Sequence, residues 1–154
     1  MSDYASQVIH TLQGKTLATA ESCTGGGIGA ALTAVSGSSA VFCGGIISYT
    51  NDVKQKLLNV PGELLMEKGA VSPEVAEAMA IGARKALHAD IAVSVTGLAG
   101  PGGDAYGNPV GTVYIGYADA NIVLNRGFCF PGDREAVRSQ AVQQALLLIM
   151  EQNR

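Results

Sequence analysis

The residues best suited to chemistry lie at one strand-to-helix junction. A short β-type run over 16–20 leads to Ser22 and Cys23, then to Thr24 and glycines 25–27, after which a helical pattern begins. Such a junction exposes a side-chain nucleophile. It also directs free backbone N–H groups and the positive end of the helix dipole at a neighbouring negative charge. That charge could be a bound phosphate or the oxyanion of an acyl-transfer intermediate, so the junction predicts a nucleotide site, an acyl-transfer site, or both.

Two adjacent side chains could act as the nucleophile. Ser22 occupies the expected place, but the Gly-x-Ser-x-Gly elbow of the α/β-hydrolases is absent because Ala20 and Thr24 stand at the glycine positions. Cys23 is the rival, since a helix N-terminus lowers the pKa of a thiol. The unreactive alternatives are a serine that caps the helix and a small buried cysteine.

A serine nucleophile needs a base, and the two histidines are poorly placed to provide it. His10 belongs to the first predicted helix, and His88 ends a long one. A lysine or a tyrosine is the alternative. Tyr49 and Lys54 follow the second predicted strand, so they should emerge at the same sheet edge as Ser22 if the strands are parallel. Lys54 could then be the base, while Tyr49 relays a proton or positions the substrate; a solvated surface helix is the competing interpretation.

A long glycine-rich loop over 96–109 follows the third predicted strand. It begins with Thr96 and Gly97, and Gly100 lies within it. Ligands of open α/β sheets bind at the carboxyl ends of the strands, so three such loops should converge on one crevice. A purely structural Ω-loop is the alternative.

Two arginines stand at the start of the last predicted helix. Arg134 and Arg138 are four residues apart, where cations oppose the helix dipole. Their placement makes sense if they face an anion such as phosphate. The alternative is pairing with Asp133 or Glu135.

The same glycines also fit a dinucleotide-binding pattern. The run 25–30 matches G-x-G-x-x-A, and Asp52 lies where a ribose-binding acid would belong. The match is weak, because the chain is too short for a second mononucleotide-binding half. A P-loop is excluded, since no Gly-Lys-Ser or Gly-Lys-Thr follows. A dehydrogenase therefore ranks below a hydrolase.

The length and composition of the chain predict a single domain over 1–154 with enough apolar residues for a sizeable core. Apolar residues make up 47% of the chain and charged residues 15%, with a net charge of −3. That balance argues against a nucleic-acid partner, which normally meets a basic patch. The first residues lack the apolar region of a signal peptide, and no apolar run approaches the ~18 residues of a membrane span. Three cysteines without framework or metal-ligand spacing suit a reducing compartment, so we expect a cytoplasmic protein without a metal site.

The hydrophobic pattern predicts strands that alternate with helices. The helices are expected over 4–13, from 28 onward, over 52–58, 63–68 and 73–88, and from 133 onward; the strands over 16–20, 41–49 (buried), 91–95, 110–117 and 122–130. The last two strands flank a short turn and should form an antiparallel hairpin. The fold class is therefore α/β: a three-layer α/β/α sandwich with a mixed, mostly parallel sheet.

These segments together resemble the CinA C-terminal domain family. The similarity rests on AESCTGG, GGIISYTNDVK, GAVSPEVA, SVTGLAGPGG, PVGTVYIG and FPGDREAVR, which cover nearly the whole chain in the expected order. The family includes bacterial nicotinamide mononucleotide amidohydrolases. No molybdopterin-binding-like domain precedes these segments, so the chain resembles the stand-alone form.

The resemblance implies hydrolysis of the carboxamide of nicotinamide mononucleotide to nicotinate mononucleotide and ammonia, without cofactor or metal. It implies Ser22 as the nucleophile, assisted by Tyr49 and a lysine, with Lys54 the choice and Lys56 the reserve. The residues expected at the substrate are Thr24, Gly25, Gly26, Thr96, Gly97, Gly100, Arg134 and Arg138. Homodimers are common among such domains, so a homo-oligomer is expected. The alternative is a non-catalytic nucleotide-binding module of the same fold.

Overall fold

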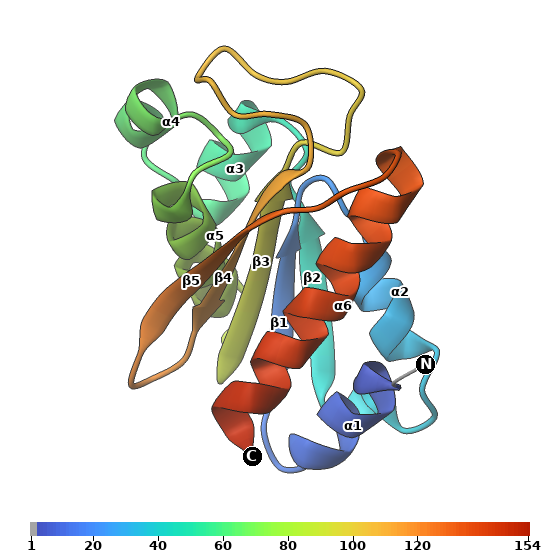
Figure 1. Ribbon diagram of the computed structural model, residues 1–154. Coiled ribbons are helices and arrows are strands. Elements are labelled where there is room, and N and C mark those ends of the chain that lie inside the picture. Colours follow the sequence, from blue (N-terminus) through green and yellow to red (C-terminus); the bar gives the residue numbers. More distant parts are fainter. Residues whose placement is uncertain (1–2) are drawn as a thin grey trace.

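A five-stranded sheet separates two layers of helices in the computed structural model, which describes residues 3–154 (Figure 1). The first two residues of the predicted domain lie outside this range. The strands are β1 (Leu17–Glu21), β2 (Phe42–Ile47), β3 (Ile91–Gly97), β4 (Thr112–Ala118) and β5 (Val123–Cys129). The helices are α1 (Tyr4–Thr11), α2 (Gly27–Thr33), α3 (Asn51–Leu58), α4 (Gly62–Lys68), α5 (Pro73–Ala86) and α6 (Arg134–Asn153), with a 3₁₀ turn, η1, at Ser38–Ala40.

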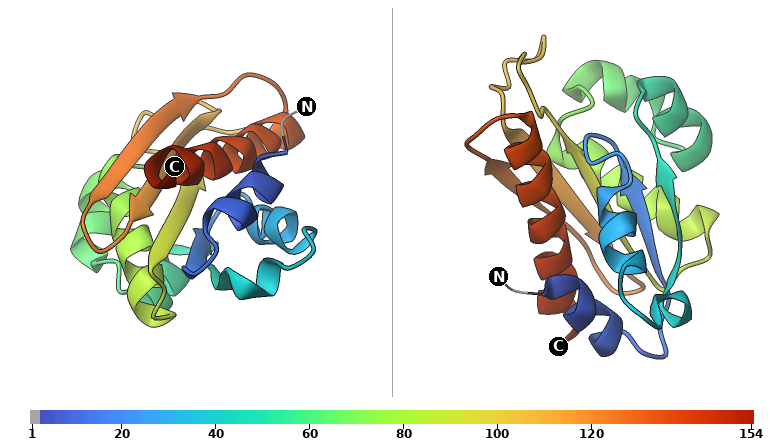
Figure 2. Two further views of the ribbon diagram at one scale, coloured as in Figure 1. Left: turned by 90° about the horizontal axis from the view of Figure 1, so that it is seen from below. Right: turned by 90° about the vertical axis from the view of Figure 1, so that its right-hand side faces the viewer.

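The strand order β2-β1-β3-β4-β5 makes the sheet mixed. β1 pairs in parallel with β2 and β3, whereas β4 is antiparallel to β3 and β5. Figure 2 shows α1, α2 and α6 on one face of the sheet and α3, α4 and α5 on the other. The predicted α/β/α sandwich and its hairpin are therefore confirmed, and the carboxyl ends of β2, β1 and β3 meet at one edge.

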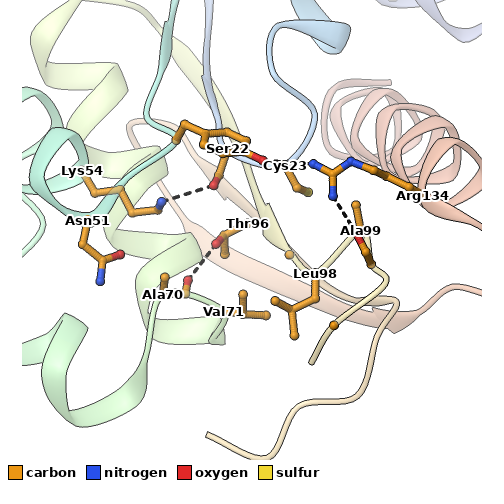
Figure 3. Close-up of a pocket in the computed structure, with 14 residues that line it drawn as sticks. Ser22, Cys23, Asn51, Lys54, Ala70, Val71, Thr96, Leu98, Ala99 and Arg134 are labelled. Atoms are coloured by element: carbon orange, nitrogen blue, oxygen red, sulfur yellow. Dashed lines mark hydrogen bonds between the residues drawn. The ribbon is translucent and has the colours of Figure 1, made fainter. Parts of the chain in front are cut away.

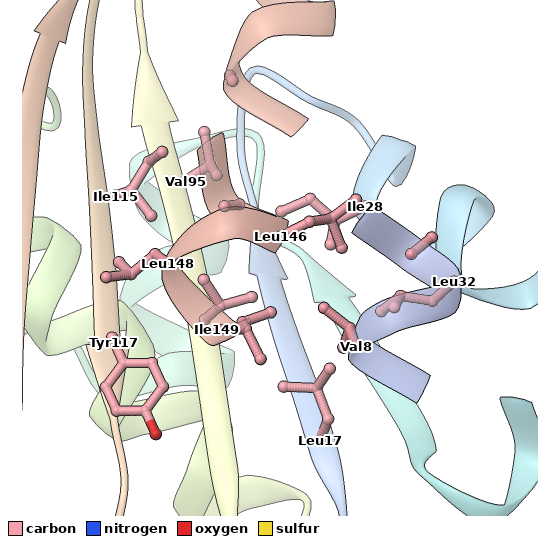
Figure 4. Packing of buried hydrophobic residues seen from close by; sticks show 14 of the residues in the cluster. Val8, Leu17, Ile28, Leu32, Val95, Ile115, Tyr117, Leu146, Leu148 and Ile149 are labelled. Atoms are coloured by element: carbon pink, nitrogen blue, oxygen red, sulfur yellow. The ribbon is translucent and has the colours of Figure 1, made fainter. Parts of the chain in front are cut away.

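Two apolar clusters fill the spaces between the layers. The larger packs α1, α2 and α6 against the sheet around Leu17, Ile28 and Leu146 (Figure 4). The smaller lies under α3 to α5, where strand alanines such as Ala20 leave room for α5. Burial on this scale is the main source of fold stability.

Strand β2 differs from its prediction, because it is an edge strand and not a buried one. Half-buried residues alternate with exposed ones along it, and 55% of Ile47 is exposed to solvent. A short apolar run does not reveal whether a strand has one neighbour or two. The register between β1 and β2 also shifts by one residue, because Leu17 pairs with Phe42 and Ala18 with Gly44, which leaves Cys43 of β2 unmatched.

Side-chain caps fix the starts of the helices around the sheet edge. The Thr50 hydroxyl accepts the Val53 N–H and so begins α3, and the Ser72 hydroxyl accepts the Val75 N–H at the predicted start of α5. Asp133 caps α6 in the same way. Within residues 3–154, no helix is long and apolar enough to span a membrane.

Candidate active site

The carboxyl ends of β1, β2 and β3 open into a pocket of 270 Å³ (Figure 3). Each strand end contributes a part of its wall, as expected for parallel strands that end at one edge. The lining residues are Ser22, Cys23, Tyr49, Asn51, Lys54, Ala70, Val71, Thr96, Gly97, Leu98, Ala99, Gly100, Gly102 and Arg134. The predicted convergence of three loops is therefore present.

Ser22 and Lys54 face each other at the bottom of this pocket. Lys54 Nζ lies 3.2 Å from Ser22 Oγ and donates a hydrogen bond of 2.8 Å to the Ser48 carbonyl oxygen. The Lys54 side chain is only 1% exposed, and no carboxylate of the described range forms an ion pair with it. Burial lowers the pKa of Lys54 from 10.5 to about 8. With this pKa, roughly one tenth of Lys54 is neutral at pH 7, and the neutral amine has a lone pair that can accept the serine proton.

The other candidate lysine is placed differently. Lys56 lies on the solvent side of α3, where its ammonium pairs with Asp52 at 3.1 Å. Both side chains are about 70% exposed, so neither reaches Ser22. Asp52 also fails to line the pocket, which removes the acidic residue that a dinucleotide site would require.

Cys23 lines the pocket, but its thiol is poorly suited to attack. Burial raises the pKa of Cys23 to about 11, despite the nearby cations Arg138 and Lys54. A thiol is nucleophilic as the thiolate, which is scarce at such a pKa.

Sequence analysis missed the role of Glu21 next to the nucleophile. Its carboxylate is 2% exposed and accepts four hydrogen bonds. The donors are the Thr24 hydroxyl at 2.7 Å, the Ile28 N–H at 2.9 Å, the Gly29 N–H at 3.0 Å and the Thr19 hydroxyl at 3.2 Å. The sequence does show an acidic residue shortly before a glycine-rich helix start. A side chain that caps a helix is usually the residue directly before it, however, whereas Glu21 binds N–H groups seven and eight residues later.

Glu21 changes what the start of α2 can do. The expectation that this helix start faces a ligand's negative charge is wrong for the N–H groups of Ile28 and Gly29, because a protein carboxylate already binds them. A second anion at this point would be repelled. The dinucleotide interpretation, which needs a pyrophosphate at this point, loses its main support.

Thr24, Gly25 and Gly26 lie in the turn behind the pocket and not in its wall. The Gly25 N–H donates to the Ser22 carbonyl at 3.0 Å. The N–H groups of Cys23, Thr24 and Gly26 donate to no other residue within the range 3–154. These three backbone donors are the part of the predicted anion-stabilising turn that stays available.

The two arginines of α6 have separate roles in the structure. Arg134 lines the pocket, where it donates to the Tyr49 hydroxyl at 3.0 Å and to the Gly100 carbonyl at 2.7 Å. Arg138 lies outside the pocket and donates to the carbonyls of Cys23 and Thr24 at 2.9 and 3.2 Å. Neither arginine forms an ion pair with a carboxylate of residues 3–154.

The third strand end supplies a polar residue and a glycine wall. Thr96 is buried, and its hydroxyl donates to the Ala70 carbonyl at 2.7 Å (Figure 3). Gly97 and Gly100 line the pocket after it. Neither His10 nor His88 does, and the described part of the chain contains no group of three His, Cys, Asp or Glu side chains that could hold a metal ion.

Comparison with known proteins identifies a family. The family model of the CinA C-terminal domain matches residues 2–153. A CinA-like protein of Citrifermentans bemidjiense is 55% identical over 126 residues, which are 82% of this chain and 30% of that protein. A CinA-like protein of Parasynechococcus marenigrum is 60% identical over 113 residues, 72% of this chain and 27% of that protein. The chain thus spans less than a third of the length of these curated relatives.

Solved structures match over almost the whole length. The competence/damage inducible protein CihA of Agrobacterium tumefaciens is 40% identical with a TM-score of 0.95, and the alignment covers 100% of this chain and 98% of that one. A competence-damaged protein (CinA) superfamily protein of Klebsiella pneumoniae is 34% identical, also with a TM-score of 0.95, over 99% and 98% of the two chains.

Proposed function

The chain belongs to the CinA C-terminal domain family, and on this basis we propose that it hydrolyses the carboxamide of nicotinamide mononucleotide to nicotinate mononucleotide and ammonia. The observation that carries the proposal is the contact between Ser22 Oγ and the buried amine of Lys54. A buried amine that is free of carboxylates and partly neutral is suited to deprotonate the serine hydroxyl beside it.

In the first step, neutral Lys54 accepts the Ser22 proton while Ser22 Oγ attacks the carboxamide carbon. The hydrogen bond to the Ser48 carbonyl holds the amine in place, because it uses one N–H and leaves the lone pair directed elsewhere. The positive charge of the pyridinium ring makes the carboxamide carbon more electrophilic. General-base assistance of this kind contributes roughly 10²–10⁴-fold in rate.

The oxyanion of the tetrahedral intermediate needs hydrogen-bond donors close to Ser22. The candidates on the same turn are the N–H groups of Cys23, Thr24 and Gly26, and of these three residues only Cys23 lines the pocket. A good donor at this position is worth about 3–4 kcal/mol of the activation barrier. Protonated Lys54 then gives its proton to the leaving nitrogen, and ammonia departs. Water, deprotonated by Lys54, attacks the acyl carbon, the bond to Ser22 Oγ breaks, and Lys54 returns the proton to Ser22.

Arg134 is the better placed of the two arginines for the substrate phosphate. It lines the pocket, whereas the guanidinium of Arg138 is engaged by two backbone carbonyls. Tyr49, which is 58% exposed and bonded to Arg134, would border the same end of the substrate. Apolar side chains such as Leu98 and Val71 offer a surface for the pyridine ring.

The test is steady-state ammonia release from nicotinamide mononucleotide, with nicotinamide and NAD as comparison substrates. We expect turnover of the mononucleotide, loss of at least 10³-fold in Ser22→Ala, and a covalent acyl adduct on Ser22 detectable by mass spectrometry. Binding of the nucleotide without ammonia release would favour the non-catalytic module. Undiminished release by Ser22→Ala would refute the assignment of the nucleophile.

A further inference from the structure

The carboxylate of Glu21 lies directly beside the proposed nucleophile in sequence but points to the other side of the sheet. Ser22 meets Lys54 from α3, whereas the Glu21 carboxylate binds the first residues of α2. We propose that Glu21 is a positioning residue: its carboxylate clamps the turn 22–26 against α2, so that Ser22 Oγ and the free N–H groups of the turn keep a fixed relation. This inference rests on the proposed function of Ser22.

The four hydrogen bonds of Glu21 tie three separate parts of the chain together. One carboxylate oxygen accepts from the Thr24 hydroxyl and the Ile28 N–H, so it joins the turn to the helix. The other accepts from Gly29 N–H and the Thr19 hydroxyl, so it joins the helix to β1. Two donors on each oxygen, in a site that excludes water, fix the carboxylate and everything bonded to it.

The surrounding structure is built to accept this arrangement. A side chain at Gly45 of β2 would collide with the Thr19 hydroxyl, so the glycine opens the space in which that hydroxyl lies. A side chain at Gly29 would lie 3.3 Å from the Phe42 ring and 3.6 Å from the Glu21 carboxylate. The network therefore depends on the close approach of β2 and α2 around one buried charge.

The opposite side of the turn is held by Arg138. Its guanidinium donates to the Cys23 and Thr24 carbonyls, which therefore point toward α6. In a trans peptide the N–H points opposite to the preceding carbonyl, so the Thr24 N–H points away from α6. The turn is thus fixed from both sides, by a carboxylate that accepts and a guanidinium that donates.

The test variant is Glu21→Gln, which keeps the size of the side chain but places an N–H₂ group against backbone N–H donors. Asp119→Asn is the matched control, because the Asp119 carboxylate accepts two backbone N–H groups and the Tyr117 hydroxyl and does not line the pocket. Thr24→Val is a second test, since it removes only the hydroxyl that links turn and carboxylate. Melting temperatures and circular dichroism establish folding.

Two readouts separate positioning from general stability. The first is the rate at which a fluorophosphonate labels Ser22, which reports the reactivity of the nucleophile whatever the natural substrate is. The second is whether kcat or KM changes when nicotinamide mononucleotide is the substrate. We expect Glu21→Gln to lower the labelling rate and kcat at least tenfold, with KM within threefold of the wild-type value. Thr24→Val should lower the labelling rate and kcat several-fold. In Asp119→Asn the labelling rate and kcat should stay within twofold of the wild type. The pH at which the rate of each folded variant inflects should not move.

The outcomes are distinct. Labelling of folded Glu21→Gln or Thr24→Val at the wild-type rate overturns the positioning role. A lower KM in Glu21→Gln also overturns it, because it would mean that the carboxylate repels substrate phosphate at α2. Wild-type protein that is labelled at Ser22 but releases no ammonia refutes the proposed substrate alone. Wild-type protein that shows neither reaction refutes both proposals.

Discussion

The pH dependence of catalysis should be set by Lys54 and should move when a charge is added beside it. Asn51 lines the pocket three residues before Lys54 on α3, so Asn51→Asp adds a carboxylate of the same shape on an adjacent position of the helix. At a separation of about 6 Å and an effective dielectric constant of about 20, the attraction would be ~3 kcal/mol, equivalent to about two pKa units. Asn51 is exposed, so we reduce the expected rise in the Lys54 pKa to about one unit.

The consequence for the rate follows from the neutral fraction of Lys54. With the pKa of about 8, roughly one tenth of the lysine is neutral at pH 7. A pKa one unit higher reduces this to about one hundredth, so kcat/KM at pH 7 should fall about tenfold and the inflection should move up by about one unit. At pH 10 the lysine is mostly neutral in both proteins, so their rates should agree within about twofold.

The assay is ammonia release from nicotinamide mononucleotide between pH 6 and pH 10. Gln55→Glu is the matched control, since it adds the same charge to α3 at a neighbouring position that does not face Lys54. An inflection in Asn51→Asp that stays in place, or a loss of rate that persists at pH 10, would contradict the identification of Lys54 as the titrating base.

Four further variants test other parts of the site. Lys54→Met should abolish turnover. It should also raise the free energy of unfolding, measured in urea titrations, by up to about 3 kcal/mol at pH 7, because the folded state lowers the lysine pKa from 10.5 to about 8. This gain in stability should shrink as the pH rises from 8 toward 10.5. Cys23→Ala should keep kcat within about threefold, and a loss comparable to that of Ser22→Ala would transfer the nucleophile to the thiol. Arg134→Gln should raise KM for the mononucleotide about 10–100-fold and leave KM for the phosphate-free riboside unchanged; equal effects on both would argue against a phosphate contact. Gly82→Ala should destabilise the protein by about 1–3 kcal/mol and reduce turnover, because the added methyl meets the Leu58 carbonyl where α5 supports α3; wild-type stability in urea would show that these helices can separate freely.

Sequence patterns predicted the parts of this site that depend only on which residues follow each strand. Strand ends followed by Ser22, Tyr49 and Thr96 placed three loops at one sheet edge, because parallel strands of one sheet share a direction. The same reasoning put Lys54 near Ser22, although it could not decide between Lys54 and Lys56. The deciding fact is which side of α3 each residue occupies, and that depends on how the helix packs against α5.

The features that were not predicted depend on contacts between distant residues. Glu21 bonds to N–H groups seven and eight residues later, and Arg138 reaches carbonyls more than a hundred residues earlier. No local pattern encodes such partners. The exposure of β2 was missed for a related reason, since its apolar residues, such as Ile46, fit an edge strand and a central one equally well.

In this chain, Glu21 at the end of β1 and Ser22 directly after it project to opposite sides of the sheet, one toward α2 and the other toward Lys54. Successive strand residues project to opposite faces, so the insertion or loss of a single residue here would exchange acid and alcohol. The carboxylate would then meet Lys54 and hold it protonated, while the hydroxyl would be left facing α2. Such a chain could keep its whole sheet and still be catalytically inactive, whereas the insertion or loss of two residues would restore the original orientation of both side chains.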